Sequence, residues 1–327
     1  MTVRPRGRIH LAVLARSRTG FSSLERLART AERGLFDFLL LADGPGPVRD
    51  SDPEPRAVLG ALAGVTERLG LAAPVDPAVA EPYEAARGLA TLDHLSGGRA
   101  AWNVPASPRA AELVAVAREL WESWTPEGVA RPVAHQGRHF DLAGEFGLPR
   151  SPQGHPVVIH ARGHHEDGDD WGDGGGRESG ASREFAAASA DVIVGRRGSP
   201  EADRAFRADM RRRLPQYGRA PRDLRIMSGV TVVLGDTDAE ARRRASSLSG
   251  RPSFLGTPEA VAAQLEESAR EEAADGFVLL PHPAPGGLDE FVDRVVPLLQ
   301  ERGVFRTEYD GATLRSHLGL PVPVWKG

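Results

Sequence analysis

The feature of this sequence that most constrains its fold is an alternation, repeated eight times, of a short apolar run with a segment of helical periodicity. Apolar runs such as FDFLLL (residues 36–41) are typical of parallel strands that helices cover on both faces. We predict strands over residues 9–14, 36–41, 70–75, 99–104, 156–160, 191–194, 224–234 and 276–280. Eight strand–helix repeats favour a (β/α)8 barrel, although a doubly wound sheet produces a similar alternation.

Capping residues predict where several helices begin. Ser22 with Glu25 forms a capping-box pattern, and Thr257 followed by Pro258 is typical of an N-cap and a first-turn proline. In the helical segment before the fifth strand, apolar residues recur at helical spacing and end at Trp124. We therefore predict that Trp124 belongs to the core.

Composition excludes several classes of protein. The 327-residue chain contains no cysteine, which excludes disulfides and thiolate chemistry, and its lone lysine, Lys326, is next to the last residue. A net charge of −4 gives no sign of nucleic-acid binding. No run of about 18 apolar residues predicts a membrane span, and no secretory signal is recognisable. A cytoplasmic protein is expected.

Candidate functional residues follow from the barrel, because chemistry in this architecture lies at the carboxyl ends of the strands. Asp43 directly follows a predicted strand and either binds a ligand or caps a loop. Trp102 and Asn103 end the fourth strand, where the tryptophan fits a core position and the asparagine amide could bind a heterocycle. Arg196 and Arg197 follow the sixth strand, and surface arginines are favoured there over an anion site.

The segment LDHLSGGR (residues 92–99) is typical of a tight connection between a helix and a strand. Gly97 and Gly98 adopt positive φ without strain. We therefore assign His94 and Arg99 structural roles.

Residues 163–180 are rich in Gly and Asp and predict a flexible inserted loop. Asp167, Asp169 and Asp173 match three positions of an EF-hand loop, but Trp171 stands where a further oxygen ligand belongs. A solvated loop is favoured over calcium binding, and no metal site is predicted.

Several longer stretches carry more specific information. Six stretches resemble, in the same order, the bacterial luciferase-like flavin-dependent monooxygenases. The branch in question includes nitrilotriacetate monooxygenase component A, the dibenzothiophene sulfone monooxygenase and a pristinamycin synthase. The stretches are residues 81–104 (EPYEAARGLATLDHLSGGRAAWNV), 119–124 (ELWESW), 135–142 (HQGRHFDL), 148–159 (LPRSPQGHPVVI), 256–265 (GTPEAVAAQL) and 274–320.

The resemblance implies one luciferase-like TIM-barrel domain over residues 1–327, with shortened insertions and a C-terminal extension at 303–327. It implies a monooxygenase that uses reduced FMN from a separate flavin reductase to oxygenate a small organic substrate. A deazaflavin cofactor is a variant of this expectation, and a homodimer is expected. The flavin carries the chemistry, so no catalytic side chain is identified.

The resemblance also implies which residues contact the flavin. Asp43 matches the family's aspartate after the second strand, and Trp102 with Asn103 matches its WN pair. Ser179 matches the serine that holds the flavin phosphate, while Ser182 replaces the family's glycine.

This sequence departs from the family pattern elsewhere. Ala73 and Pro74 stand where the family usually has Thr or Ser facing the flavin, and an HDxRY-like segment after Asn103 is missing. The alternative hypothesis is therefore a degenerate barrel with weak or no flavin binding, which acts as a structural or partner protein.

Overall fold

Eight parallel strands close into a barrel in the computed structural model. The structure describes residues 8–42, 53–125, 127–161, 180–246, 248, 252–271, 274–280 and 287–325. The barrel strands are β1 (His10–Arg16), β2 (Phe38–Ala42), β3 (Gly70–Pro74), β4 (Ala100–Asn103), β7 (Val157–Ala161), β8 (Val192–Arg196), β9 (Arg225–Val230) and β12 (Gly276–Leu279). Their order around the wall is β1-β12-β9-β8-β7-β4-β3-β2. All eight predicted strands are confirmed within a few residues, and closure decides in favour of the barrel over the doubly wound sheet.

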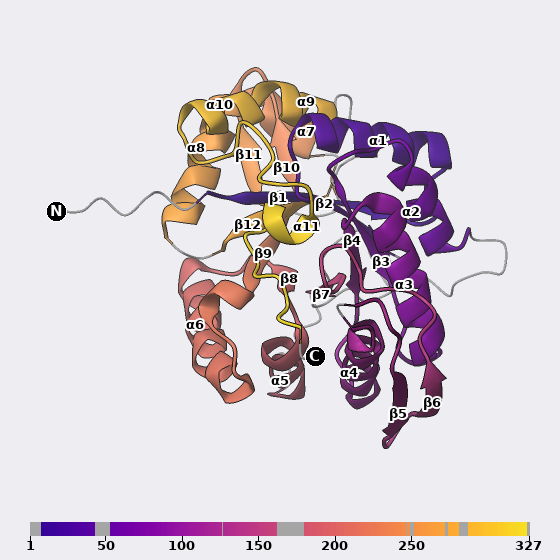
Figure 1. Cartoon of the computed structure of the whole chain (residues 1–327). Helices are drawn as coiled ribbons and strands as arrows, with labels where there is room; N and C mark the ends of the chain where they lie inside the picture. The colour runs from indigo at the N-terminus through magenta and orange to yellow at the C-terminus, as the bar shows by residue number, and fades with distance from the viewer. Residues whose placement is uncertain are drawn as a thin grey trace.

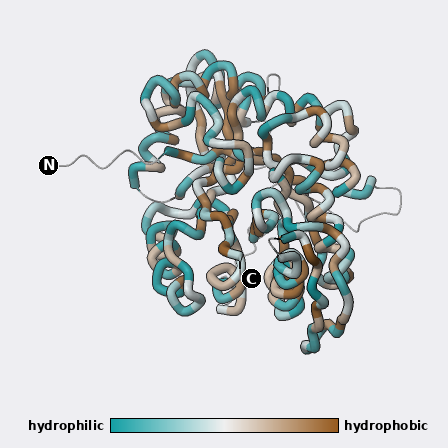
Figure 2. The backbone as a smooth tube through the Cα atoms, in the orientation of Figure 1, coloured by the Kyte–Doolittle hydropathy of each residue, from teal (hydrophilic) through white to brown (hydrophobic). Residues whose placement is uncertain are grey.

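Helices surround the strands, and the apolar segments gather at the centre of the molecule (Figures 1 and 2). They are α1 (Phe21–Arg33), α2 (Pro55–Ala63), α3 (Pro82–Ser96), α4 (Pro108–Glu122), α5 (Gly180–Ser189), α6 (Pro200–Arg213), α7 (Asp238–Ala245), α8 (Pro258–Arg270), α9 (Gly287–Arg294), α10 (Val296–Glu301) and α11 (Leu314–His317). Two 3-10 turns, η1 (Leu214–Tyr217) and η2 (Pro221–Asp223), follow α6. Among the described residues, no helix is both long and apolar enough to cross a lipid bilayer.

Two short two-stranded sheets outside the barrel were not predicted. β5 (Pro132–Gln136) pairs with β6 (Asp141–Glu145) as an antiparallel hairpin, and β10 (Val232–Leu234) pairs with β11 (Phe254–Gly256) in parallel. Most side chains of the hairpin are exposed or half-buried, so the apolar runs that identify barrel strands are missing there.

Some predicted helix details are wrong and others are confirmed. α1 begins at Phe21 after Gly20 without a side-chain cap, so the capping box of Ser22 and Glu25 is wrong. Glu25 instead accepts a hydrogen bond from Arg29, one turn further along. The cap at Thr257 is confirmed, because its hydroxyl accepts the backbone N–H of Ala260.

Trp124 lies beyond the end of α4, so its assignment to the helix is wrong, and it is half-buried against the core rather than inside it. Its ring packs against the edge of the core, and its Nε1 donates to the carbonyl of Phe146 at 2.8 Å. The polar indole N–H is satisfied at the rim, where a backbone carbonyl is available.

The connection between α3 and β4 has the predicted structural role. Gly97 and Gly98 have φ of 68° and 93°, and Gly97 ends α3 in the left-handed conformation. Arg99 is 3% exposed, and its guanidinium donates to backbone carbonyls including those of Thr66 and Leu69. His94 is exposed and lies 3.1 Å from the carbonyl of Pro149.

The C-terminal extension closes the bottom of the barrel, at the amino ends of the strands. Leu314, Leu318 and Leu320 belong to the same buried cluster as the inward residues of the strands. α11 lies over the middle of the ring of strands in Figure 1. Gly70 makes room for it, because a Cβ there would come within 2.7 Å of Leu314.

Three aspartates that make the same kind of polar contact stabilise this bottom face. Asp37, Asp191 and Asp275 each stand directly before a barrel strand, and each carboxylate accepts a backbone N–H from the neighbouring strand. Each carboxylate also pairs with an arginine; the partners are Arg306, Arg315 and Arg207 in that order. Because a parallel strand begins with an unpaired N–H, the carboxylate satisfies a donor that would otherwise be buried alone.

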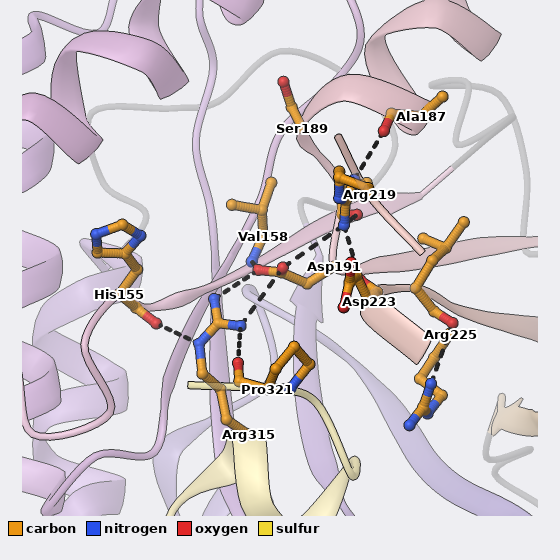
Figure 3. A network of polar contacts seen from close by, with 12 residues as sticks. His155, Val158, Ala187, Ser189, Asp191, Arg219, Asp223, Arg225, Arg315 and Pro321 are labelled. Atoms are coloured by element: carbon orange, nitrogen blue, oxygen red, sulfur yellow. Dashed lines mark hydrogen bonds and ion pairs between the residues drawn. The ribbon is translucent and has the colours of Figure 1, made fainter. Parts of the chain in front are cut away.

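Asp191 lies at the centre of one of these networks (Figure 3). Its carboxylate lies 2.8 Å from Nη2 of Arg315 and 2.9 Å from the N–H of Val158, with Arg219 at 3.9 Å. Burial alone would raise the pKa of Asp191, but the charges of Arg315, Arg118 and Arg219 outweigh it and hold that pKa below the usual range. The carboxylate is therefore ionised in the folded protein and is committed to the fold.

Candidate active site at the barrel mouth

The inside of the barrel is identified by one buried cluster to which all eight barrel strands contribute alternate residues. Only the lumen is shared by every strand of a barrel, and successive side chains of a strand point to opposite faces. The alternation therefore defines the last inward position at the carboxyl end of each strand. These positions are Arg16, Ala42, Pro74, Asn103, Ala161, Arg196, Gly229 and Leu280.

This set, which we call the mouth ring, differs from the lumen below it. The lower lumen is filled by large apolar side chains such as Phe38, Leu40 and Met227. The mouth ring instead combines four small residues and one leucine with two arginines and one asparagine, and contains no carboxylate. The arrangement places hydrogen-bond donors where a barrel enzyme binds its ligands.

Asn103 is half-buried at the end of β4, and its side chain links two strands of the mouth. Its Oδ1 accepts the backbone N–H of Ala161 at 2.9 Å, at the end of β7. In the described part of the chain its amide nitrogen makes no hydrogen bond to protein. Two N–H donors at the mouth are therefore available to a ligand.

Trp102, the other predicted residue at this strand end, faces away from the lumen. Its side chain belongs to the outer core cluster, is fully buried, and packs edge-to-face on Trp121 of α4 at 5.8 Å. A side chain without accessible surface does not touch a bound molecule unless the fold changes. Its placement favours the core interpretation over a direct flavin contact.

The start of α5 is tied to the barrel wall by His160 of β7, which is 3% exposed. Nδ1 of His160 lies 3.2 Å from the carbonyl of Val104, and Nε2 lies 3.0 Å from Oγ of Ser182. Because a carbonyl only accepts, Nδ1 carries the proton and Nε2 accepts the Ser182 hydroxyl. The edge of the Phe185 ring closes the same outer layer at 5.3 Å.

The other two predicted flavin contacts, Asp43 and Ser179, lie outside the described residues, as does the predicted loop 163–180 except for Gly180, which begins α5. Sequence reasoning did not single out Arg16 and did not predict the contact between His160 and Ser182. Strand alternation, counted from the apolar residues of β1, is the signal that could have found Arg16. Within the described ranges, no three acidic or histidine side chains gather closely enough to hold a metal ion.

The closed barrel, with hydrogen-bond donors on its mouth ring, has the architecture of a TIM-barrel enzyme whose site lies at the carboxyl ends of the strands. Residues 6–167 and 174–280 match the family model described as luciferase-like monooxygenase. The chain therefore belongs to the luciferase-like monooxygenase family, which confirms the predicted resemblance, the barrel and the class of enzyme.

Relatives align along most of the chain. It is 30% identical to nitrilotriacetate monooxygenase component A of Aminobacter aminovorans, covering 91% of this chain and 89% of the relative. It is also 30% identical to dibenzothiophene-sulfone monooxygenase of Rhodococcus erythropolis, over 93% and 90% of the two chains. EDTA monooxygenase from Chelativorans sp. BNC1 superposes with a TM-score of 0.83 at 25% identity, covering 96% of this chain and 98% of that one.

The alignments with the two sequence relatives extend over 419 and 426 positions, more than the 327 residues of this chain. Both relatives therefore contain segments that this chain lacks, as the prediction of shortened insertions requires.

Proposed function

We propose that this protein is a two-component monooxygenase that binds reduced FMN at the mouth ring and oxygenates a small organic substrate. The observation that carries the proposal is Asn103, whose free amide donors lie at the mouth of a barrel of this family. A separate flavin reductase is the proposed source of the reduced cofactor, and the designation "component A" of one relative supports a partner of this kind.

The described residues fit this cofactor. The isoalloxazine ring has carbonyl oxygens that accept hydrogen bonds, and the Asn103 amide supplies matching donors. Its phosphate is an anion, and the exposed first turn of α5 offers backbone N–H groups that can bind it. When bound, reduced FMN supplies the electrons that activate O2.

The protein's own contribution is to hold and shield this group. Asn103 orients the ring, while the His160–Ser182 contact fixes the first turn of α5 against β7. The apolar side chains of the lower lumen and the α11 closure keep water from reaching the site through the barrel. Exclusion of water is what protects a reactive oxygenating species from hydrolysis.

Three finer proposals accompany this function. FMN is proposed over a deazaflavin, a homodimer over a monomer, and the cytoplasm as the location. The degenerate-barrel alternative is not favoured, because relatives aligned over most of the chain are named monooxygenases.

The test is a titration of the purified protein with FMN, reduced FMN and a reduced deazaflavin under anaerobic conditions, followed by calorimetry. We expect micromolar binding of reduced FMN, weakened about tenfold by Asn103→Ala, since a hydrogen bond is worth about 1 kcal/mol or slightly more. Ser179→Ala tests the contact that the family resemblance implies. Thr91→Ala, on the exposed face of α3, is the control and leaves binding unchanged. Absence of saturable binding to millimolar concentration would contradict the proposal.

A further inference from the structure

The mouth ring contains two arginines from different parts of the barrel wall, and the function proposed above leaves their purpose open. We propose that Arg16 and Arg196 form a binding site for an organic anion, and that the substrate of this enzyme therefore carries a carboxylate or a similar acidic group. The inference rests on the proposed function, because the anion must lie beside the cofactor to be oxygenated.

Placement of the two side chains follows from their strands. Ala12 and Leu14 of β1 lie in the lumen cluster, and Arg16 is the next residue on that face. Val192 and Val194 of β8 lie in the same cluster, and Arg196 follows them. Both side chains therefore leave their strands on the lumen side of the mouth.

The two strands are not neighbours. β12 and β9 separate them in the wall (Figure 1), so the two arginines come from different parts of it. Arg16 is half-buried and Arg196 is exposed, which makes the pair accessible from the open end. A ligand with two acidic groups, or one with a single group between them, matches this arrangement.

Charge on the mouth ring is unbalanced. The ring contains two cations and no carboxylate, and it lies above an apolar lumen. Arginine binds carboxylates through paired N–H donors, which gives direction as well as affinity. Both arginines make other contacts in the folded chain, so an incoming anion joins or replaces those contacts.

Arg197, at the same end of β8, has a structural role and serves as a comparison for Arg196. It is the next residue along the chain and faces away from the lumen. Its guanidinium stacks over the ring of Phe254 at 4.6 Å and contacts the carbonyl of Ser253 at 3.4 Å. For Arg197 these contacts, like the predicted surface role, argue against an anion site, and for Arg196 the lumen placement favours one.

The relatives do not decide the charge of the substrate. Their names include an acid, nitrilotriacetate, and a sulfone without an acidic group. The inference therefore depends on the two arginines of this chain.

The test compares succinate with succinamide, its neutral diamide of similar shape, by calorimetry on the full chain without flavin and then with saturating FMN. We expect succinate to bind and succinamide not to bind. Arg16→Gln and Arg196→Gln each weaken succinate about tenfold or more, because each removes a charge-assisted hydrogen bond. Arg197→Gln is the matched control and leaves succinate affinity unchanged. Thermal melting of all three variants checks that the fold is intact.

A second arm identifies the source of the anion. FMN and riboflavin differ by the phosphate, so a variant that weakens FMN and spares riboflavin has lost a phosphate contact. If Arg196→Gln does this and leaves succinate unaffected, the arginine serves the cofactor and the substrate assignment is overturned. Equal binding of succinate and succinamide, or no binding of succinate, also overturns it. Loss of flavin binding with succinate binding retained instead contradicts the proposed function and leaves the anion site standing.

Discussion

The two ends of this barrel contain polar groups of similar kinds and use them differently. At the bottom, carboxylates accept hydrogen bonds from strand N–H groups and pair with arginines beneath the C-terminal extension. At the mouth, Asn103 has free amide donors, and the two arginines belong to a ring of eight positions that includes no carboxylate. A polar group that the fold has already neutralised stabilises the protein, whereas a donor that faces the open end of the barrel can bind a ligand.

The largest effect on the free energy of unfolding is expected from removing a buried carboxylate at the bottom of the barrel. Asp191→Ala leaves the guanidiniums of Arg315 and Arg219 buried without their carboxylate. Removing one partner of a buried ion pair costs about 3–5 kcal/mol. We expect urea denaturation to show a loss of this size in the free energy of unfolding. A loss below about 1 kcal/mol would mean that the bottom network contributes little to the fold.

A second prediction concerns how the free energy of unfolding depends on pH through His317, which is buried at the bottom of the barrel. Because burial penalises its charged form, the pKa of His317 falls from 6.5 to about 4, and the unfolded chain takes up this proton first. The stability that neutral His317 contributes is present above pH 6.5 and is lost as the pH falls toward 4. The slope from this group reaches at most about 1.4 kcal/mol per pH unit.

Denaturation series at several pH values between 7 and 4 should show this slope in the wild type and a smaller slope in His317→Gln. His94→Gln, at an exposed position, is the matched control and should keep the wild-type slope. Equal slopes in all three proteins would show that His317 does not titrate as its burial requires.

A third and smaller effect is expected at the mouth. His160→Phe removes the contacts to the Val104 carbonyl and the Ser182 hydroxyl while keeping an aromatic ring beside Phe185. Leaving buried polar groups unsatisfied costs about 1–3 kcal/mol. Because the first turn of α5 is then less firmly held, affinity for FMN should fall more than affinity for riboflavin. Equal losses for the two ligands would separate His160 from the phosphate end of the site.

The smallest effect is expected at an exposed pair on the bottom face itself. Arg8 and Asp310 lie 3.2 Å apart with side chains 58% and 53% exposed. Such pairs contribute about 0–1 kcal/mol, so Asp310→Ala should change the free energy of unfolding by less than about 0.5 kcal/mol. If its effect equalled that of Asp191→Ala, burial would not be what distinguishes the bottom network.

The sequence by itself determined the barrel strands, the glycine turn after α3 and the family. Apolar runs and glycines act through neighbouring residues, and the quoted motifs are read directly along the chain. For this reason the predictions for residues 36–41 and for Gly97 agree with the structure. Asn103 was singled out in the same way, and the structure confirms that it ends a strand.

Only the tertiary structure decided which face each strand-end residue occupies. Trp102 and Asn103 are neighbours in sequence, yet one packs on Trp121 outside the wall and the other reaches the lumen. Arg196 and Arg197 likewise lie on opposite faces of the wall, with Arg196 on the lumen face and Arg197 packed on Phe254 outside it. The Asp191–Arg315 pair joins residues 124 positions apart, and no local pattern encodes such a contact. Which face of the wall a side chain occupies depends on how all eight strands close into the barrel. The local sequence therefore identifies the strand end but not whether a given side chain faces the lumen or the helices.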